Sequence, residues 1–592
     1  MTATHSTSRS GAFATLAVSG VLGYYVGAHG FPAWQVPVET AQVVAGIVRY
    51  PPGNPFFIYH VKLWTLIHQL CAALLTTGVS EIRLSAMLSG VTGMVSFQAL
   101  AMTAYAFSRS TWFSTIAAIV IFAGRATDYG VRYPIFLLGT SHTYGSLGLS
   151  WLVLVAALVG CGCYGTGLFL LGLAPAIHPS LGVWLALIAA LSLAWNPEMT
   201  RSSIVPRWRW FAAGALVSAV SLALHLWAGR GVQAIDPATA SRYLSAFTEL
   251  WDEHRQPMGF ANAGVVLNVA AMVAGVMWLT FFKPALPSAS SFILRFVTVS
   301  GLVSLTCVAI SHVAADRLPS LLIVLMPTRV VNVDAMMFAA MILGMAATYR
   351  THVWGAILVV GLIAGLLLNH QGLLSPRFEG LTSVALEPRL LTLAILLVGA
   401  GWLAAGAAWM TLTSRDGPRT SPLVRVAGDL AVIGIAAVAL VPGIVRLPPR
   451  TEMAGFRDRT NDGLFATASR ANGMLLTGGD IHLAQLRTRR PVLVDGGGLD
   501  GLPYAVAGAP ETERILRDVY GIDFFHPPPE AHGIGMIPSS YNKIVWEKYS
   551  TDRWQEIRRA YNVTQVLTYN NWILHLPIVA QNASYLLYEI PE

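Results

Sequence analysis

The sequence predicts a polytopic α-helical membrane protein of about 11 to 13 transmembrane helices, followed by an α/β domain outside the membrane. Of its 592 residues, 54% are hydrophobic and only 11% are charged, and the mean hydropathy is +0.57. Apolar runs of about 17 to 25 residues, the length that crosses a bilayer, recur from Gly11 to Val445. Beyond Arg446 the charge rises and long apolar runs end. We therefore expect a transmembrane domain over residues 1–446, with an outer loop at 31–60, and an extracytoplasmic domain over 447–592.

The first apolar run, about Gly11–Gly30, predicts a retained helix rather than a cleaved signal, because no small-residue cleavage site follows it. Arg9 precedes this run and no basic residue follows it closely, so we expect a cytoplasmic N-terminus. The polar, proline-rich loop Gln35–His60 then lies outside.

The second apolar run, Val61–Gly78, predicts another span, with Glu81 and Arg83 in a tight cytoplasmic turn after it. Seven apolar runs precede a basic loop at Arg201–Arg209, which we also assign to the cytoplasm. An even number of crossings is required between two cytoplasmic points, so one run is a half-helix or two runs merge. The short candidates for the half-helix are Thr111–Gly124 and Tyr164–Ala176.

Later spans alternate with polar and basic loops. The segment Arg317–Arg329 is shorter than the roughly 20 residues that cross a bilayer, and we expect it to be re-entrant. The last predicted helix, Val426–Val445, delivers the C-terminus to the outer side.

The C-terminal region alternates short β-type runs with helical runs, which predicts a small α/β domain. It lies on the same side as the Gln35–His60 loop. The β-type runs are 473–479, 490–498, 564–570 and 584–590, and the helical runs are 511–521 and 551–562.

The outer loop supplies the first candidate site residues. Glu39 is the loop's carboxylate, suited to act as a general base or a metal ligand. Alternatively, Glu39 only places an acid in the first turn of a helix, where the helix dipole favours it. Arg49 stands before a Pro-Pro-Gly-Asn-Pro segment and either binds a phosphate or braces the turn.

Polar residues near the membrane supply further candidates for substrate or phosphate binding. Asp128 and Arg132, with His142 nearby, form either an ion-paired brace or an anion site. His178 interrupts two apolar runs and is either a ligand or a packing residue.

Two loops predicted on the outer side complete the set. His254 and Arg255 follow Trp251 in a loop that suits sugar recognition by stacking and hydrogen bonding, or is only solvated. Arg329 ends the predicted re-entrant segment and is a candidate for binding a lipid phosphate. Gly496–Gly498 lacks the spacing of a phosphate-binding loop and predicts a turn at a strand end.

One helix, an acidic outer loop with the YPPGNPFF segment, many further helices, a His-Pro break and an outer α/β domain together resemble the GT-C superfamily of membrane glycosyltransferases. The resemblance implies sugar transfer, with inversion, from a polyprenyl-phosphate donor to a lipid, glycan or protein acceptor. Glu39 would be the catalytic acid, alone or with a divalent cation, and Arg329 or Arg49 would face the phosphate. The superfamily usually carries a pair of acids, whereas this loop carries one.

The resemblance is with bacterial branches of the superfamily, so we expect the inner membrane as the location, with membrane lipids around the helices. The basic residues lie in short loops that set topology, so we expect no nucleic-acid partner. Two other functions are open: a non-catalytic scaffold that binds a protein partner through residues 447–592, and a flippase for a lipid-linked glycan.

Overall fold

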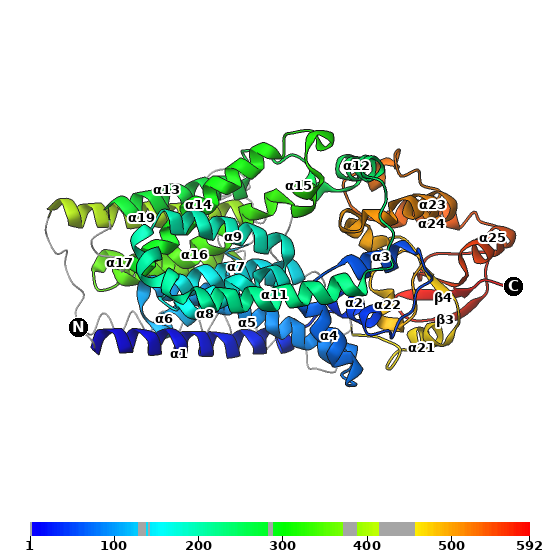
Figure 1. Cartoon of the computed structure of the whole chain (residues 1–592), viewed down its shortest axis with the longest axis horizontal. Helices are drawn as coiled ribbons and strands as arrows, with labels where there is room; N and C mark the ends of the chain where they lie inside the picture. Colours follow the sequence, from blue (N-terminus) through cyan, green and yellow to red (C-terminus); the bar gives the residue numbers. More distant parts are fainter. Residues whose placement is uncertain (1–2, 128–137, 140–142, 282–287, 371–387, 414–455) are drawn as a thin grey trace.

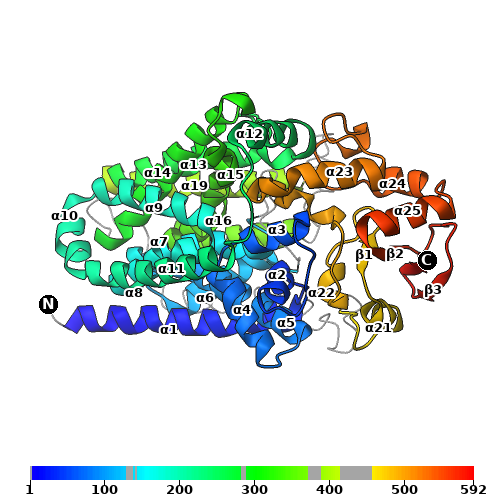
Figure 2. The ribbon, with the colours of Figure 1, turned by 45° about the vertical axis from the view of Figure 1, so that its right-hand side comes forward.

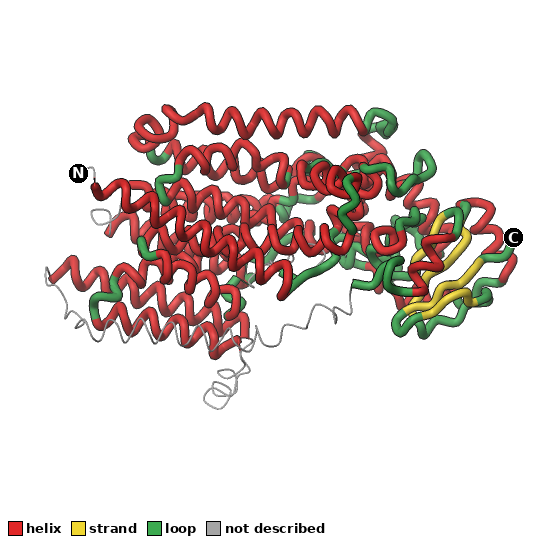
Figure 3. The backbone as a smooth tube through the Cα atoms, turned by 90° about the horizontal axis from the view of Figure 1, so that it is seen from below, coloured by secondary structure: helices red, strands yellow, loops and turns green. Residues whose placement is uncertain are grey.

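The computed structural model describes residues 3–127, 138–139, 143–281, 288–370, 388–413 and 456–592. The molecule is elongated, with long helices along one axis and a small sheet at one end, near the C-terminus (Figures 1 and 3). The predicted last helix, Val426–Val445, lies outside the described residues.

The helical region contains these elements in chain order: α1 (Ala3–Tyr25), η1 (Val26–Gly30), α2 (Val36–Val44), α3 (Pro55–Lys62), α4 (Leu66–Thr76), α5 (Glu81–Ser108), α6 (Thr111–Ala123), α7 (Thr143–Gly160), α8 (Tyr164–Ile177), α9 (Pro179–Ala194), α10 (Pro197–Met199), η2 (Thr200–Ile204), η3 (Val205–Arg207), α11 (Trp208–Ala228), α12 (Pro237–Ala246), η4 (Phe247–Trp251), η5 (Glu253–Arg255), α13 (Ala263–Phe281), α14 (Ser288–Ile310), η6 (Ala315–Arg317), α15 (Ser320–Leu325), η7 (Pro327–Val330), α16 (Val331–Thr348), α17 (Val353–His370) and α19 (Pro388–Thr413).

Within the described ranges, seven helical runs are long and apolar enough to cross a membrane, and five shorter apolar helices accompany them. Within the run from Ser320 to Thr348, α16 is buried by its neighbours over Val331–Ala347, whereas Leu321 in α15 is 66% exposed. The prediction of a multi-span helical protein with a C-terminal α/β region is confirmed. The segment predicted to be re-entrant contains α15 and η7, which are separated at Met326, whose backbone is left-handed (φ 45°), and α16 follows η7 directly.

The predicted span Val61–Gly78 does not connect the two ends of the helical bundle, and this prediction is wrong. α3 and α4 meet at an angle of 105°. Asn54 before α3 and Glu81 after α4 both bond to the C-terminal region: Asn54 Nδ2 donates to the Leu493 carbonyl (3.0 Å), and Glu81 is ion-paired with Arg489. The chain therefore returns to the end from which it left. The predicted turn at Glu81 therefore lies at the end of the bundle that holds the C-terminal region.

The C-terminal region contains α21 (Gly463–Arg470), β1 (Met474–Thr477), α22 (Ala484–Thr488), η9 (Gly496–Tyr504), η10 (Val506–Gly508), α23 (Ala509–Tyr520), η11 (Pro529–Ala531), α24 (Ser539–Trp546), α25 (Thr551–Tyr561), β2 (Val563–Tyr569), β3 (Ile578–Gln581) and β4 (Tyr585–Glu589).

These strands form one sheet in the order β1-β2-β4-β3, with β1 and β2 parallel and the other two pairs antiparallel. β1, β2 and β4 and helices α23 and α25 match the predicted runs. The predicted strand 490–498 is only a single parallel bridge, Leu475 to Val492, because the chain turns into η9 at Gly496. Buried Trp546 and Trp554 pack edge to face in the core beside the sheet.

The C-terminal region docks directly on the outer loop, and Figure 2 shows α2 and α3 next to α22. Gln42 Nε2 of α2 donates to the Leu486 carbonyl (3.1 Å), and the Tyr50 hydroxyl donates to Gln485 Oε1 (2.6 Å). The loop after the first helix and the C-terminal region therefore share one polar interface.

Candidate functional site

Glu39 lies in the first turn of α2, which begins after Gln35 with Pro37 in its opening turn. Only 1% of Glu39 is exposed, because α22 covers it. The Leu486 N–H donates to Glu39 Oε1 (3.3 Å), and Gln485 Nε2 donates to the Glu39 carbonyl (2.9 Å). The carboxyl group thus faces the C-terminal region.

Two side chains of the C-terminal region accompany Glu39. His482 Nδ1 lies 3.0 Å from Asp495 Oδ1, and the Asp495 carboxylate also accepts hydrogen bonds from the N–H groups of Leu483 (3.0 Å) and Gly497 (2.9 Å). Burial alone would lower the pKa of His482, but the charge and the hydrogen bond of Asp495 are the main causes that raise it to about 9. His482 is therefore held as a cation at neutral pH.

The same cluster shifts the proton affinity of Glu39. Burial, together with the charge of Asp495, raises the pKa of Glu39 from 4.5 to about 8, although His482 and the Leu486 N–H oppose the rise. Glu39 therefore holds a proton at neutral pH in this closed arrangement. A carboxyl group whose pKa lies this close to the working pH is suited to proton transfer.

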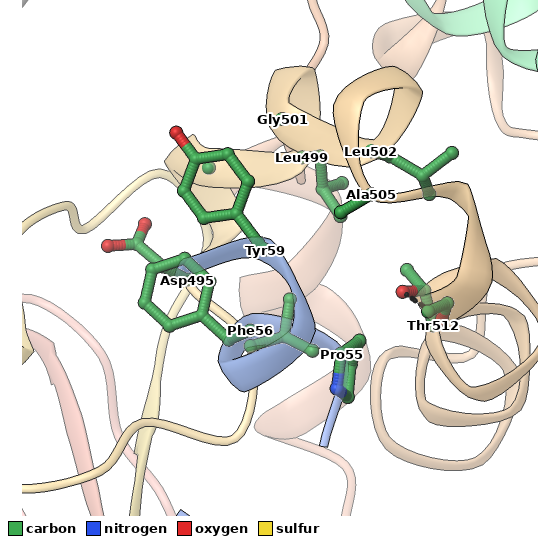
Figure 4. Close-up of a pocket in the computed structure, with 12 residues that line it drawn as sticks. Pro55, Phe56, Tyr59, Asp495, Leu499, Gly501, Leu502, Ala505 and Thr512 are labelled. Atoms are coloured by element: carbon green, nitrogen blue, oxygen red, sulfur yellow. Dashed lines mark hydrogen bonds between the residues drawn. The ribbon is translucent and has the colours of Figure 1, made fainter. Parts of the chain in front are cut away.

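A pocket adjoins the cluster, between α3 and η9 (Figure 4). The rings of Phe56 and Tyr59 and the carboxylate of Asp495 lie at one side of it, and Thr512 lies at the other. Its cavity volume is about 30 Å³, which is room for water but much less than the roughly 300 Å³ of a small ligand pocket. A sugar ring would require α3 and η9 to separate.

Glycines in η9 allow it to pack closely against α3. A Cβ atom on Gly498 would lie 3.1 Å from the Phe56 ring, and one on Gly501 would lie 2.2 Å from the Tyr59 ring. The Gly496–Gly498 segment, predicted as a turn at a strand end, opens the short helix η9 against α3.

The loop that carries His254 and Arg255 is docked rather than solvated. Arg255 forms an ion pair with buried Asp252, its Nε donates to the Ile323 carbonyl (3.0 Å), and its guanidinium lies 5.4 Å from the Tyr504 ring. The Thr328 hydroxyl donates to the His254 carbonyl (3.4 Å). Arg255 is thus committed to contacts inside the protein.

Arg329 lies near this loop because it follows Thr328, which bonds to His254. His178 lies near Arg329 in turn. The His178 ring caps α9 by accepting from the Leu181 N–H (3.4 Å) and stacks on Tyr144 at 4.8 Å. Arg329 is close enough for its charge to act on His178. The structure thus brings together four of the predicted residues, His178, His254, Arg255 and Arg329.

The remaining predicted residues stay apart or lie elsewhere. Arg49 is exposed on the outer loop. Asp128, Arg132 and His142 lie outside the described residues. Among the residues that the structure describes, no group of three or more His, Cys, Asp or Glu side chains is arranged to hold a metal ion.

The sequence interpretation missed His482 and Asp495. Both follow the carboxyl ends of two neighbouring parallel segments, β1 and the bridged segment at Val492. In α/β proteins, ligand sites gather beyond the carboxyl ends of parallel strands. A histidine and an acid at these two positions would have identified His482 and Asp495 as candidate site residues.

No family model matches this chain, and no curated protein matches it. Among solved structures, ArnT from Cupriavidus metallidurans bound to undecaprenyl phosphate is similar to it, with a TM-score of 0.36 and 12% sequence identity. The alignment covers 97% of each chain. The likeness is one of loose overall shape, so the reaction has to be argued from the residues of this chain.

Proposed function

We propose that this protein is a membrane glycosyltransferase of the GT-C type, which transfers a sugar from a polyprenyl-phosphate donor to a lipid, glycan or protein acceptor. The observation that supports it most is the position of Glu39. This acid of the loop after the first helix is buried beside His482 and a second carboxylate, Asp495. The loop alone offers one acid, and the C-terminal region supplies another.

In the proposed reaction, an acceptor hydroxyl attacks the anomeric carbon of the donor sugar. A bond forms from the acceptor oxygen to that carbon, and the bond from the carbon to the phosphate oxygen breaks on the opposite face, so the configuration inverts. The step requires Glu39 in its ionised form: the hydroxyl proton passes to this carboxylate, and the electron pair leaves with the polyprenyl phosphate. A carboxylate with a raised pKa is a stronger base than an ordinary one.

The leaving phosphate needs positive charge as its own charge develops. We propose Arg329 for this contact, with His178 beside it, because both lie where α9 meets the segment before α16. Arg255 is a weaker candidate since its guanidinium is paired with Asp252. Arg49 is exposed and has room to meet a headgroup.

The function is tested in the source organism by deleting the gene and comparing cell-surface glycans and glycolipids by mass spectrometry. We expect one glycan or glycolipid to lack a sugar. Wild-type protein should restore it, whereas Glu39→Gln and Asp495→Asn should not, at equal protein levels in the membrane. Glu530→Gln, at an exposed acid of the C-terminal region, is the matched control and should restore it.

Other outcomes identify the alternatives. Full restoration by Glu39→Gln would refute the proposal and favour a scaffold. A deletion strain that makes the complete lipid-linked glycan, but keeps it on the inner face, would also refute sugar transfer and favour a flippase.

A further inference from the structure

Four polar side chains lie inside the helical bundle where α13, α14 and α16 meet. Asn268 comes from α13 and Asp334 from the first turn of α16. Ser300 and Ser304 come from α14, where their spacing of four residues puts them on the same face of the helix. Each is at most 1% exposed. A Cβ atom on Gly301, next to Ser300, would lie 3.2 Å from both the Asn268 carbonyl and Asp334 Oδ2, so the three helices are in close contact at this level.

The oxygens of these side chains lack hydrogen-bond partners in the part of the chain that the structure describes. This applies to Asn268 Oδ1, both hydroxyls and both oxygens of Asp334. Ser300 lies beside the Asp334 carboxyl group, but no hydrogen bond of ordinary geometry joins them. Buried polar groups without partners are uncommon and call for an explanation.

Neighbouring hydroxyls in the same bundle behave differently. Thr298 on α14 donates to the Leu294 carbonyl one turn back (2.8 Å), and Thr103 on α5 donates likewise to the Ala99 carbonyl (2.8 Å). Hydroxyl groups in apolar helices commonly make this bond. Ser300 and Ser304 do not make it, so their oxygens stay available to another group.

The charge of Asp334 needs a counter-charge. Within the described ranges, no Lys, Arg or His forms an ion pair with this carboxyl group. Moving an unpaired carboxylate out of water costs several kcal/mol or more, so either a proton or a bound cation balances it.

The donor set favours a cation. The Asn268 amide nitrogen donates to the carbonyls of Gly264 and Val331 (both 2.7 Å), which leaves Oδ1 as a fixed acceptor toward the cluster. The available ligands are therefore all oxygens, which hard cations prefer. One formal negative charge balances one positive charge, whereas a divalent ion would leave an excess charge in a low-dielectric site.

We propose that Asn268, Ser300, Ser304 and Asp334 form a binding site for a small monovalent cation of the sodium type. The cation would be held by the Asp334 carboxylate, Asn268 Oδ1 and the two hydroxyls. It would fix α16, the most buried helix of the bundle, against α13 and α14. The site is independent of sugar transfer.

The test is thermal melting of the purified full-length protein in detergent, titrated with sodium chloride, potassium chloride or choline chloride at constant ionic strength. We expect sodium to raise the melting temperature in a saturable way and choline to have no effect. Asp334→Asn should abolish the sodium response. Thr298→Val is the matched control on α14 and should keep it, because Thr298 bonds only to its own helix.

If Asp334→Asn does not fold, Ser304→Ala provides the second test, since it removes one ligand oxygen and leaves no charge unpaired. It should raise the half-saturating sodium concentration several-fold. A melting temperature that does not respond to sodium at any pH between 5 and 9 would overturn the proposal, because a proton would then balance Asp334. A sodium response that persists unchanged in both variants would overturn it as well.

Discussion

Replacing Glu39 by Gln should flatten the dependence of stability on pH. The pKa of Glu39 rises from 4.5 to about 8 in the folded protein because the carboxyl group is buried and lies near Asp495. The folded state thus keeps a proton that the unfolded chain releases near pH 4.5. The stabilisation from this proton is complete below pH 4.5 and is lost as the pH rises through 8.

The size of this effect follows from the shift. At 1.36 kcal/mol per pKa unit, the rise from 4.5 to about 8 corresponds to at most about 5 kcal/mol between these pH values. Protonation of His482 also stabilises the folded state, and this contribution is lost at higher pH than that of Glu39. Its pKa rises from 6.5 to about 9, so its contribution is complete below pH 6.5 and is lost as the pH rises through 9. Wild-type stability should therefore fall continuously from pH 5 to pH 9.

The measurement is the melting temperature of the full-length protein in detergent between pH 5 and pH 9. Gln has the shape of the protonated Glu and can still accept from the Leu486 N–H, so Glu39→Gln should match the wild type near pH 5 and exceed it near pH 8. His482→Gln should flatten only the upper part of the curve. Exposed Glu530→Gln is the control, with a curve parallel to that of the wild type. A Glu39→Gln curve that is also parallel would refute the reasoning.

Two further predictions concern the packing of η9 against α3 and the ion pair between Asp252 and Arg255. Gly501→Ala should destabilise docking of the C-terminal region by about 1 to 3 kcal/mol, because the new methyl group would overlap the Tyr59 ring. Limited proteolysis should show faster cleavage of this region, whereas Gly463→Ala, where a Cβ atom meets nothing within 4 Å, should not change the cleavage rate. Arg255→Met should lower stability by about 3 to 5 kcal/mol, because it leaves the buried Asp252 carboxylate without its partner. Melting curves measure this loss, and adding Asp252→Asn should recover part of it; a double variant as unstable as the single one would contradict the ion-pair argument.

The sequence patterns identified the fold class, since apolar run length and strand–helix alternation depend on local composition. They also singled out the Gln35–His60 loop and Glu39. The second apolar run was misinterpreted because its length suits a span, while the 105° bend after α3 depends on contacts of Asn54 and Glu81 with residues about 400 positions away in the chain.

The partners of Glu39 were not predicted for a related reason. His482 and Asp495 are more than 440 residues from it, and the glycines after Asp495 suggested only a turn. Burial of Glu39 under α22 follows from tertiary packing, which no local pattern encodes.

The contacts that hold the bend between α3 and α4 against the C-terminal region limit how the sequence of this protein can change in evolution. Asn54, before α3, donates a hydrogen bond to the Leu493 carbonyl. Glu81, after α4, forms ion pairs with Arg459 and Arg489, so the C-terminal region binds the chain on both sides of the bend. Residues 31–81 and 456–592 should therefore vary together in evolution, although most of the bundle separates them in the sequence. A chimera that exchanges only the C-terminal region with a distant homologue should dock poorly, whereas one that exchanges both segments together should keep the interface.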